Sequence, residues 1–330
     1  MNSTRYDIIG IGNAIVDVIA RTDDMFLDRH DMRKGAMRLI DAEAAERILT
    51  AMPPGQIASG GSVANSCAVA AGLGARTAFL GKVARDELGV AFAADLRAIG
   101  VDFPHAPLPE GAPTARCLIL VTPDGQRTMN TYLGACIDFD HTDLDAEAIR
   151  DSSILYLEGY LFDPPRAQHA FREAARIARA AGRRVALSLS DAFCVDRHRS
   201  GFLDLIASGN VDILFANEAE ICSLFEQNTF ESAAAEAAHV VPFAVLTRSE
   251  AGSVIVSGGE RHVAAALPVD VVDTTGAGDA YAAGFMVGFS RNAPLAECAA
   301  LGSRVAAAVI GRIGARPDLA TLAALAPAVA

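Results

Sequence analysis

The sequence predicts an α/β protein built on a mostly parallel sheet with helices on both of its faces. From Ile154 onward, Ala- and Arg-rich helical segments separate apolar, strand-like runs near 154–158, 185–189, 211–215 and 243–247. Such alternation is typical of a parallel sheet covered on both sides. Residues 114–133 differ, because two strand-like runs flank a turn at Pro123-Asp124-Gly125 and predict a hairpin. A small β unit therefore accompanies the large sheet.

The first hundred residues add strands and helices of the same kind. Residues 6–20 predict a buried strand, a turn at Gly12-Asn13 and a second strand that carries Asp17, and a mostly polar stretch follows to about residue 36. The other elements predicted here are a helix from Asp41, an Ala-rich helix from Gly60-Gly61-Ser62 to about Leu73, a strand at 77–80 and an amphipathic helix from Asp86 to Ile99.

One domain accounts for the whole chain. Its 330 residues show no internal repeat or low-complexity linker, and 52% are hydrophobic, which is ample for a core. We therefore expect a single domain over residues 1–330. Two inserted segments, approximately 13–40 and 105–135, are expected to form a small β-sheet lid that closes over the strand ends and excludes water.

Composition excludes several classes of partner. The net charge of −12 argues against binding to nucleic acid or to an anionic membrane, since both need a basic face. The six cysteines lie far apart without a Cys-x-x-Cys pair, which is typical of free thiols in a reducing compartment. The N-terminus lacks a signal-peptide pattern, and no apolar run is long enough to span a membrane. We expect a soluble, cytoplasmic protein.

Residues 273–279, Asp-Thr-Thr-Gly-Ala-Gly-Asp, are the most informative segment. They follow an apolar, β-prone run, Leu267 to Val272, and lead into a predicted buried helix. A glycine-rich turn at a helix start exposes backbone N–H groups, and the helix dipole adds positive charge, so the turn suits a phosphate. Asp279 beside such an anion could take a proton from an attacking hydroxyl, which indicates phosphoryl transfer. The alternative is an ordinary turn followed by an acid that favours the dipole.

Two other nucleotide-binding patterns do not fit the sequence. Gly10-Ile11-Gly12 resembles the start of a dinucleotide fingerprint, but the third glycine is missing and a strand follows instead of a helix. No glycine loop ends in Gly-Lys-Ser/Thr, so the Walker A pattern is absent from the sequence.

Polar residues in the first third predict a site for a hydroxylated acceptor. Asp17 lies in an otherwise apolar strand, and Asn13 lies in the turn before it. Gly60-Gly61 allows a ligand to approach the backbone, and Asn65 follows one helical turn later. Carboxylates and amides suit paired sugar hydroxyls. The alternatives are an edge-strand Asp17 that faces water and a simple helix cap at Ser62.

The second half supplies candidates for the phosphoryl donor. Asn217 and Glu220 follow a strand and could orient Mg²⁺-bound water, although the same spacing predicts a capping box. The turn from Thr247-Arg248 to Gly252 could wrap nucleotide phosphates or be a plain hairpin loop. Arg127, just past the Asp124-Gly125 turn, could reach a transferred phosphoryl group when the lid closes, or could be a solvated hairpin charge.

These motifs occur in the order found in the ribokinase (PfkB-type) carbohydrate and nucleoside kinase family, and the resemblance covers nearly the whole chain. Residues 60–65 resemble its first signature, 217–220 its Asn-x-x-Glu motif and 273–279 its second signature. The resemblance implies a three-layer, Rossmann-like (ribokinase-like) α/β fold with a β lid. It further implies Asp279 as the base, with the N–H groups of Gly276, Ala277 and Gly278 as the anion hole.

Within that family the chain most resembles adenosine kinases. The resemblance implies ATP, Mg²⁺ and transfer of the γ-phosphoryl group to a ribose-type primary hydroxyl, with Asp17 on the sugar. Asp273 and Thr275 match positions that border a monovalent cation such as K⁺ in some members. Tyr160 falls where an aromatic contacts the purine, although a core aromatic is equally plausible there and Pro164-Pro165 departs from the pattern.

The function expected from the sequence is an ATP-dependent nucleoside kinase, with adenosine as acceptor and AMP as product. A ribose- or fructose-type sugar kinase is the alternative, and a non-catalytic nucleoside-binding protein on the same fold is a third hypothesis. The partners expected are small molecules, with neither nucleic acid nor membrane among them. The oligomeric state is expected to be a monomer or a homodimer formed through the lid.

Overall fold

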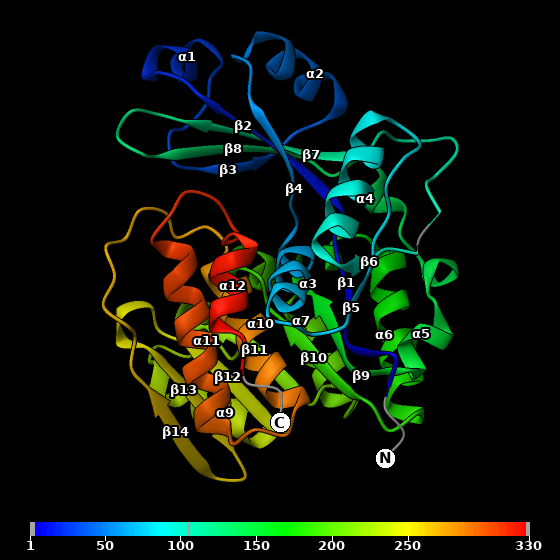
Figure 1. Cartoon of the computed structure of the whole chain (residues 1–330), viewed down its shortest axis with the longest axis vertical. Coiled ribbons are helices and arrows are strands. Elements are labelled where there is room, and N and C mark those ends of the chain that lie inside the picture. The colour runs from blue at the N-terminus through cyan, green and yellow to red at the C-terminus, as the bar shows by residue number, and fades with distance from the viewer. Residues whose placement is uncertain (1–3, 105, 328–330) are drawn as a thin grey trace.

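The computed structural model describes residues 4–104 and 106–327, and its larger sheet contains nine strands within them (Figure 1). In spatial order they are β14 (Glu260–Ala264), β13 (Ser253–Ser257), β12 (Phe243–Thr247), β11 (Ile213–Asn217), β10 (Arg184–Ser188), β9 (Ser152–Glu158), β1 (Tyr6–Ile11), β5 (Thr77–Leu80) and β6 (Val101–Asp102). Neighbours from β12 to β6 pair in parallel, whereas β13 and β14 form an antiparallel edge. The mostly parallel sheet predicted from the sequence is confirmed.

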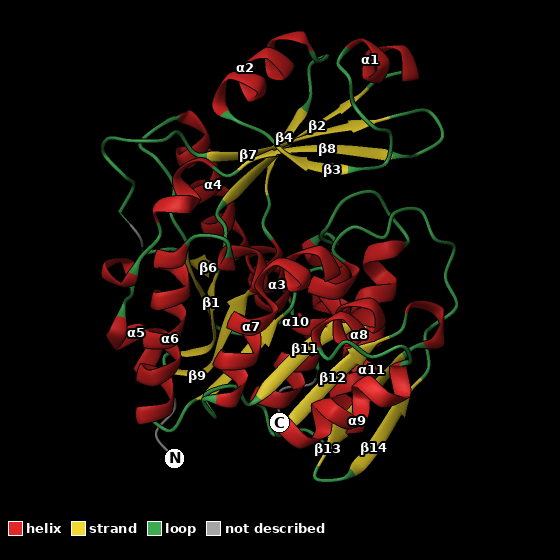
Figure 2. Cartoon of the chain, turned by 180° about the vertical axis from the view of Figure 1, so that it is seen from behind, coloured by secondary structure: helices red, strands yellow, loops and turns green. Residues whose placement is uncertain are grey.

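Helices cover both faces of this sheet and complete a three-layer α/β fold (Figures 1 and 2). One layer contains α5 (Ala146–Arg150), α6 (Pro165–Ala180), α7 (Ala192–Ala207), α8 (Glu218–Leu224) and α9 (Phe230–Val240). The other contains α3 (Ser62–Gly72), α4 (Glu87–Ile99), α10 (Ala277–Ser290), α11 (Leu295–Ile310) and α12 (Leu319–Leu325). The strands are apolar on both faces: in β9, Leu155 packs into the first layer and Ile154 into the second.

A five-stranded second sheet lies above the large one (Figure 1). Its order is β3 (Met37–Leu39), β8 (Arg127–Tyr132), β7 (Ala115–Val121), β2 (Ile15–Arg21) and β4 (Gln56–Ser59). Helices α1 (Asp24–Arg29) and α2 (Ala42–Ala51) pack on one face around Val18, Leu118 and Leu120. We call these five strands and two helices the lid.

The lid contains more elements than the sequence predicted. The expected hairpin is formed by β7 and β8, which pair in antiparallel fashion. Strand β4 lies outside both expected lid segments, and its first three residues are exposed, so it carries no buried alternation to read. Helix α1 lies within the stretch that we expected to be mostly polar, and its buried residues are Phe26 and Leu27.

The β-prone run from Leu267 to Val272 forms no strand. Val271 and Val272 are 62% and 56% exposed, and the segment is an extended loop. Pro268 lacks the N–H that a strand ladder requires, which explains why the β-branched residues do not pair here. The N–H of Val272 instead donates to the carbonyl of Ile310 at the end of α11, at 2.8 Å. The loop thereby delivers residues 273–279 to the start of α10.

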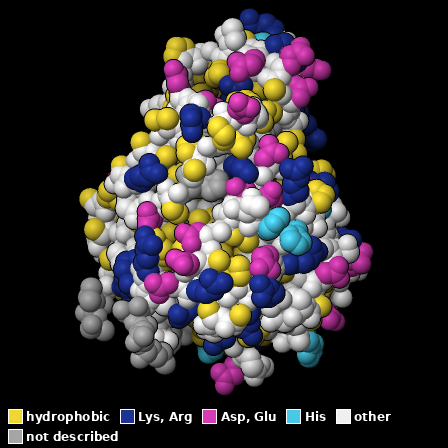
Figure 3. Space-filling view, turned by 90° about the vertical axis from the view of Figure 1, so that its right-hand side faces the viewer, with side chains coloured by type: hydrophobic (Ala, Val, Ile, Leu, Met, Phe, Trp, Pro, Cys, Tyr) yellow, Lys and Arg dark blue, Asp and Glu magenta, His cyan; other side chains and the backbone are white. Residues whose placement is uncertain are grey.

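Three further features bear on the expectations from composition. All six cysteines are free, and five of them are buried. Within residues 4–104 and 106–327, no helix combines the length and hydrophobicity needed to cross a bilayer. On the face shown in Figure 3, cationic and anionic side chains are interspersed, so this face carries no broad basic patch.

The lid core offers a test of the fold. We expect L118A to lower the free energy of unfolding by about 3 kcal/mol, because Leu118 is fully buried between β7 and the lid helices. M25A is the matched control, since Met25 on α1 is 66% exposed, and it should change stability by less than about 0.5 kcal/mol. Urea denaturation would measure both, and equal effects would contradict the assigned packing.

Candidate functional site

Asp279 lies where the N-termini of α3 and α10 meet. It occupies the first turn of α10, and its carboxylate accepts from Ser62 Oγ at 2.6 Å and from Asn65 Nδ2 at 3.1 Å. Burial raises the pKa of Asp279 to about 6, although these hydrogen bonds and the charge of Arg316 oppose that shift. A carboxylate of this kind is ionised at neutral pH and can still accept a proton.

The turn before Asp279 presents backbone donors. Gly276 has φ +75°, and a Cβ there would lie 2.6 Å from the carbonyl oxygen of Ala315, so only glycine fits. The N–H of Ala277 donates to the Thr274 carbonyl at 3.2 Å. Those of Gly276 and Gly278 have no hydrogen-bond partner among the residues described. Two of the three expected donors are therefore available to an anion at the start of α10.

Asp17 extends from the lid toward this turn. It lies on the face of β2 opposite Val18 and Ala20, which pack into the lid core. Burial raises the pKa of Asp17 to about 6, the charges of Arg316 and Arg127 lower it, and the charge of Asp279 raises it further. The two carboxylates therefore share one electrostatic environment.

The double glycine is required by close contacts on both sides. A Cβ on Gly60 would lie 2.5 Å from the Asp17 carboxylate. Gly61 has φ +93°, and a Cβ there would lie 2.2 Å from the carbonyl oxygen of Asn13. These contacts bring the β1–β2 turn, the end of β4 and the start of α3 together.

Glu158 is a buried acid that the sequence analysis did not include in the site. It ends β9 and is 1% exposed. It accepts from the side chain of Asn13 at 3.0 Å and from the backbone N–H of Val63 at 2.9 Å. Burial raises the pKa of Glu158 to about 7. The Asn13 side chain is therefore held by Glu158, which also binds the start of α3.

Arg127 joins the lid to the α10 turn. Its guanidinium lies 2.5 Å from Asp273 Oδ2 and donates to Thr275 Oγ1 at 2.8 Å, and the Arg127 and Asp273 side chains are only 12% and 8% exposed. Asp273 also accepts from the N–H groups of Thr275 and Gly314. Arg127 thus reaches the turn at 273–279 from the lid rather than extending into solvent from the hairpin.

The candidates for the donor side lie along the carboxyl edge of the sheet. Asn217 ends β11 and pairs in register with Thr247 at the end of β12. Asn217 and Glu220 form a complete capping box, in which Asn217 Nδ2 donates to Glu220 Oε1 at 2.6 Å and the Asn217 N–H donates to Oε2 at 2.9 Å. Burial raises the pKa of Glu220 to about 7.

The remaining expected residues lie nearby with partners of their own. Arg248 donates to Glu218 at 2.9 Å and stacks over the Phe230 ring, and its N–H donates to the Gly252 carbonyl at 2.7 Å. Tyr160 follows β9, and burial together with the charge and hydrogen bonding of Asp191 raises its pKa.

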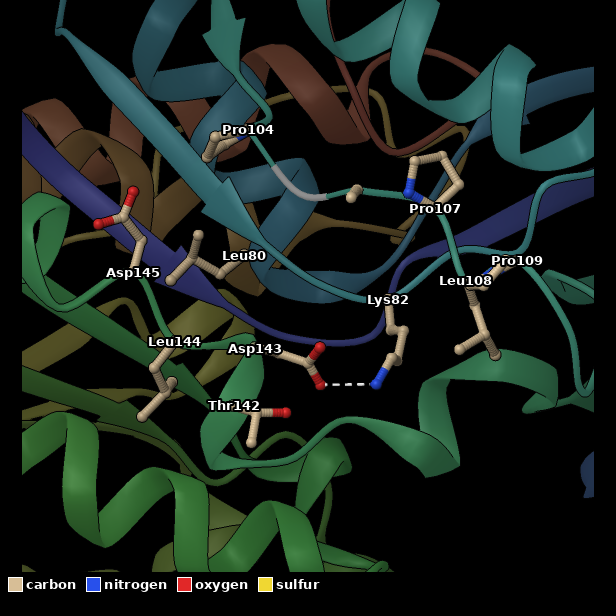
Figure 4. A pocket seen from close by; sticks show the side chains of 11 residues that line it. Leu80, Lys82, Pro104, Pro107, Leu108, Pro109, Thr142, Asp143, Leu144 and Asp145 are labelled. Atoms are coloured by element: carbon tan, nitrogen blue, oxygen red, sulfur yellow. Dashed lines mark hydrogen bonds and ion pairs between the residues drawn. The ribbon is translucent and has the colours of Figure 1, made fainter.

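A pocket lies away from this site, beside β5, Pro104 and residues 106–109 (Figure 4). Its volume is about 440 Å³, and prolines and leucines form much of its wall. Lys82 within it donates to Asp143 Oδ2 and to the Asp138 carbonyl, both at 2.8 Å. Its cation is therefore engaged by the protein, and we assign the pocket no ligand.

Comparisons with known proteins identify the family of the chain. Residues 36–322 match the pfkB family of carbohydrate kinases. The adenosine kinase of Sinorhizobium meliloti superposes with a TM-score of 0.91 and 52% identity, covering 97% of this chain and 98% of that one. A probable sugar kinase protein from Rhizobium etli gives 0.91 and 47%, covering 97% of each. An ATP-dependent ribose-1-phosphate kinase of Halopiger xanaduensis is 31% identical over 78% of this chain and 82% of its own length.

Glu158 makes stability depend on pH. A carboxyl group with a folded-state pKa near 7 binds more protons when folded than when unfolded, so its contribution is present below about pH 4.5 and is lost as the pH rises through 7. The free energy of unfolding should therefore fall by up to about 1.4 kcal/mol per pH unit from this group between pH 5 and 7. E158Q should remove that slope, whereas E236Q, at an exposed position, should retain it. Parallel slopes in E158Q and wild type would refute the assignment.

Proposed function

The chain belongs to the pfkB family of carbohydrate kinases, and we propose that it transfers the γ-phosphoryl group of ATP to the 5′-hydroxyl of adenosine, giving AMP. The observation that carries this proposal is Asp279, a carboxylate fixed between two helix N-termini, beside the N–H groups of Gly276 and Gly278, for which the described part of the chain supplies no partner. A base adjoining an anion site is the arrangement that phosphoryl transfer to an alcohol needs. The 52% identity to an adenosine kinase over nearly the whole chain supports this choice of acceptor.

In the proposed reaction, Asp279 accepts the proton of the 5′-hydroxyl as its oxygen attacks the γ-phosphorus in line. The bond from that phosphorus to the β–γ bridging oxygen breaks, and ADP leaves with the electron pair. The N–H groups of Gly276 and Gly278 stabilise the charge on the transferred group, with Ala277 shaping the turn. Arg127 lies close enough to the turn to exchange its contact with Asp273 for the phosphoryl oxygens.

On the acceptor side, Asp17 and Asn65 bind the ribose hydroxyls, and Gly60 and Gly61 let the sugar approach the backbone. Asn13 supports them through its bond to Glu158. By strand register, the face of the lid that carries Asp17 continues with Cys117, Ile119 and Met129, and it also carries the polar Thr131 and Arg127. The apolar part of that face suits a flat heterocyclic base better than a small sugar, which supports a nucleoside acceptor. Tyr160 is retained as a candidate contact for the purine.

On the donor side, we propose that Asn217, Glu220, Thr247, Arg248 and Gly252 line the nucleotide. Among the residues described, no three His, Cys, Asp or Glu side chains are gathered as a metal-ligand set. Mg²⁺ would therefore be held mainly by phosphates and water, as is common for this ion, with Glu220 acting through water. It would neutralise phosphate charge. Asp273 already accepts from Arg127 and two N–H groups, so these contacts do not form a ready K⁺ site.

A sugar kinase is the second candidate, because the Rhizobium etli and Halopiger xanaduensis relatives are named for sugar and ribose-1-phosphate substrates. A non-catalytic binder fits less well, since binding alone needs no carboxylate at the anion turn. We further propose a cytoplasmic role in purine salvage. A dimer would form through the lid edge, where Met37 and Leu39 on β3 are exposed.

A coupled ATP-turnover assay across adenosine, other nucleosides, ribose, fructose and ribose 1-phosphate tests the acceptor. We expect adenosine to give the highest kcat/KM, because part of the lid face beside Asp17 is apolar. Higher kcat/KM for a sugar would favour the second candidate, and binding of adenosine without turnover of any acceptor would favour the binder.

D279N tests the base. We expect kcat to fall about 10²- to 10⁴-fold with the fold preserved, since an amide cannot accept the proton. In wild type, kcat should rise with pH through a limb near pH 6, the pKa of Asp279, and the variant should lack that limb. D270N, at an exposed position in the preceding loop, should retain full activity. Near-wild-type turnover by D279N would exclude the assigned role.

A further inference from the structure

Arg316 is a buried cation at the centre of the site, in the loop between α11 and α12. Its side chain is 14% exposed. Nε donates to Asn65 Oδ1 at 2.8 Å, and Nη1 donates to Ser59 Oγ at 2.8 Å and lies 3.5 Å from Asp95 Oδ2. One side chain thereby connects the C-terminal loop with α3, with α4 and with the end of β4, where the lid meets the large domain.

The bond to Asn65 determines how that amide faces Asp279. An amide has an acceptor oxygen on one arm and donor hydrogens on the other. Because Arg316 donates to the oxygen, the nitrogen is the arm that faces Asp279 Oδ2, at 3.1 Å. In the opposite orientation, the amide oxygen would oppose the Asp279 carboxylate, and the amide nitrogen would oppose the guanidinium. Arg316 thus acts on the base through Asn65.

Arg316 also balances charge. The groups that interact with it electrostatically are Asp95 on α4, Asp17 on β2, Asp279 on α10 and Cys67 on α3. Glu158 and Glu220 interact with Asp279 from the other side, and Arg127 interacts with Asp17 from the lid. Buried carboxylates stay ionised only when a positive charge offsets the cost of burial. The guanidinium supplies that charge because it does not deprotonate in proteins.

The guanidinium is not saturated by these contacts. Nη2 is buried and has no hydrogen-bond partner among the residues described. An arginine that only joined structural elements would be expected to have its buried donors paired. The unpaired Nη2 and the interaction with the carboxylates of Asp17 and Asp279 both indicate a functional constraint on Arg316.

We propose that Arg316 is a positioning residue for phosphoryl transfer, which holds the Asn65 amide toward Asp279 and keeps Asp17 and Asp279 ionised. The proposal rests on the proposed role of Asp279 as the base, but it does not depend on which hydroxyl compound is the acceptor.

Two substitutions separate orientation from charge. R316K keeps the charge but loses the planar guanidinium and its Nε donor, so kcat should fall about 10-fold while the acid limb of the pH profile stays in place. R316M also loses the charge, so the acid limb should move up by about one pH unit. R312M is the matched control in the same loop, since Arg312 bonds Asp318 and Thr321 away from the site, and its kcat and limb should match wild type.

A double-mutant cycle tests the path through Asn65. If Arg316 acts through that amide, R316K should reduce kcat by less than about 2-fold in an N65A background, because the residue it orients is absent. An undiminished 10-fold loss in that background would overturn the positioning role. A wild-type kcat in R316K would overturn the role of Arg316 in orienting Asn65. An acid limb that stays in place in R316M would overturn its role in charge balance.

The assays use whichever acceptor the wild-type protein phosphorylates, so a preference for another substrate does not affect this test. Melting temperatures supply a readout without turnover. If the pKa values of Asp17 and Asp279 rise, the folded state is destabilised more as the pH rises. The melting temperature of R316M should therefore fall further between pH 5 and 8 than that of wild type. Equal losses would refute the charge role even if every acceptor fails. If R316M does not fold, the R316K cycle decides the proposal.

Discussion

The contact between the N-termini of α3 and α10 is the constraint on which the site depends. Asp279 can accept from Ser62 and Asn65 only because α10 lies close to α3 on one side and to α11 on the other. Glycines permit that approach, since a Cβ on Gly284 would lie 2.9 Å from Gly302 Cα. Small residues in α10 therefore position the carboxylate of Asp279, which lies within two turns of them on the same helix. Packing between helices in the core thereby sets the position of the proposed base.

The lid completes the electrostatics of this site. Asp17 comes from β2 and Arg127 from β8, and both side chains extend toward the turn at the start of α10. The charge of Asp279 raises the pKa of Asp17, and the charges of Arg316 and Arg127 oppose that shift. Arg316 also opposes the rise in the pKa of Asp279. The ion pair of Arg127 with Asp273 is nearly buried, so its formation holds the lid against the large domain. A phosphate bound at that turn, as proposed, would compete with Asp273 for the guanidinium.

Local patterns explain which parts of this structure the sequence predicted. The strand–helix alternation, the β7–β8 hairpin and the turn at 273–279 are each encoded by neighbouring residues, and each was predicted in place. Strand β4 was not predicted, because its first three residues are exposed and show no alternation. The run 267–272 has the composition of a strand but forms none, because Pro268 lacks the N–H that pairing requires. Glu158 and Arg316 could not be found in this way, since their partners Asn13 and Asn65 lie 145 and 251 residues away in sequence.

Two opposing effects set the pKa values of the acids in the site close to neutral pH. Glu158 binds the N-terminus of α3 and Asp279 lies in the first turn of α10, so both helix dipoles favour the ionised forms. Burial favours the neutral forms and dominates, which leaves the pKa of Glu158 at about 7 and that of Asp279 at about 6. Because a base works best when its pKa lies near the working pH, this balance suits Asp279 to its proposed role as the base. In a more deeply buried site without the arginines, Asp279 would stay protonated. In a more exposed site, its pKa would be lower and Asp279 would be too weak a base.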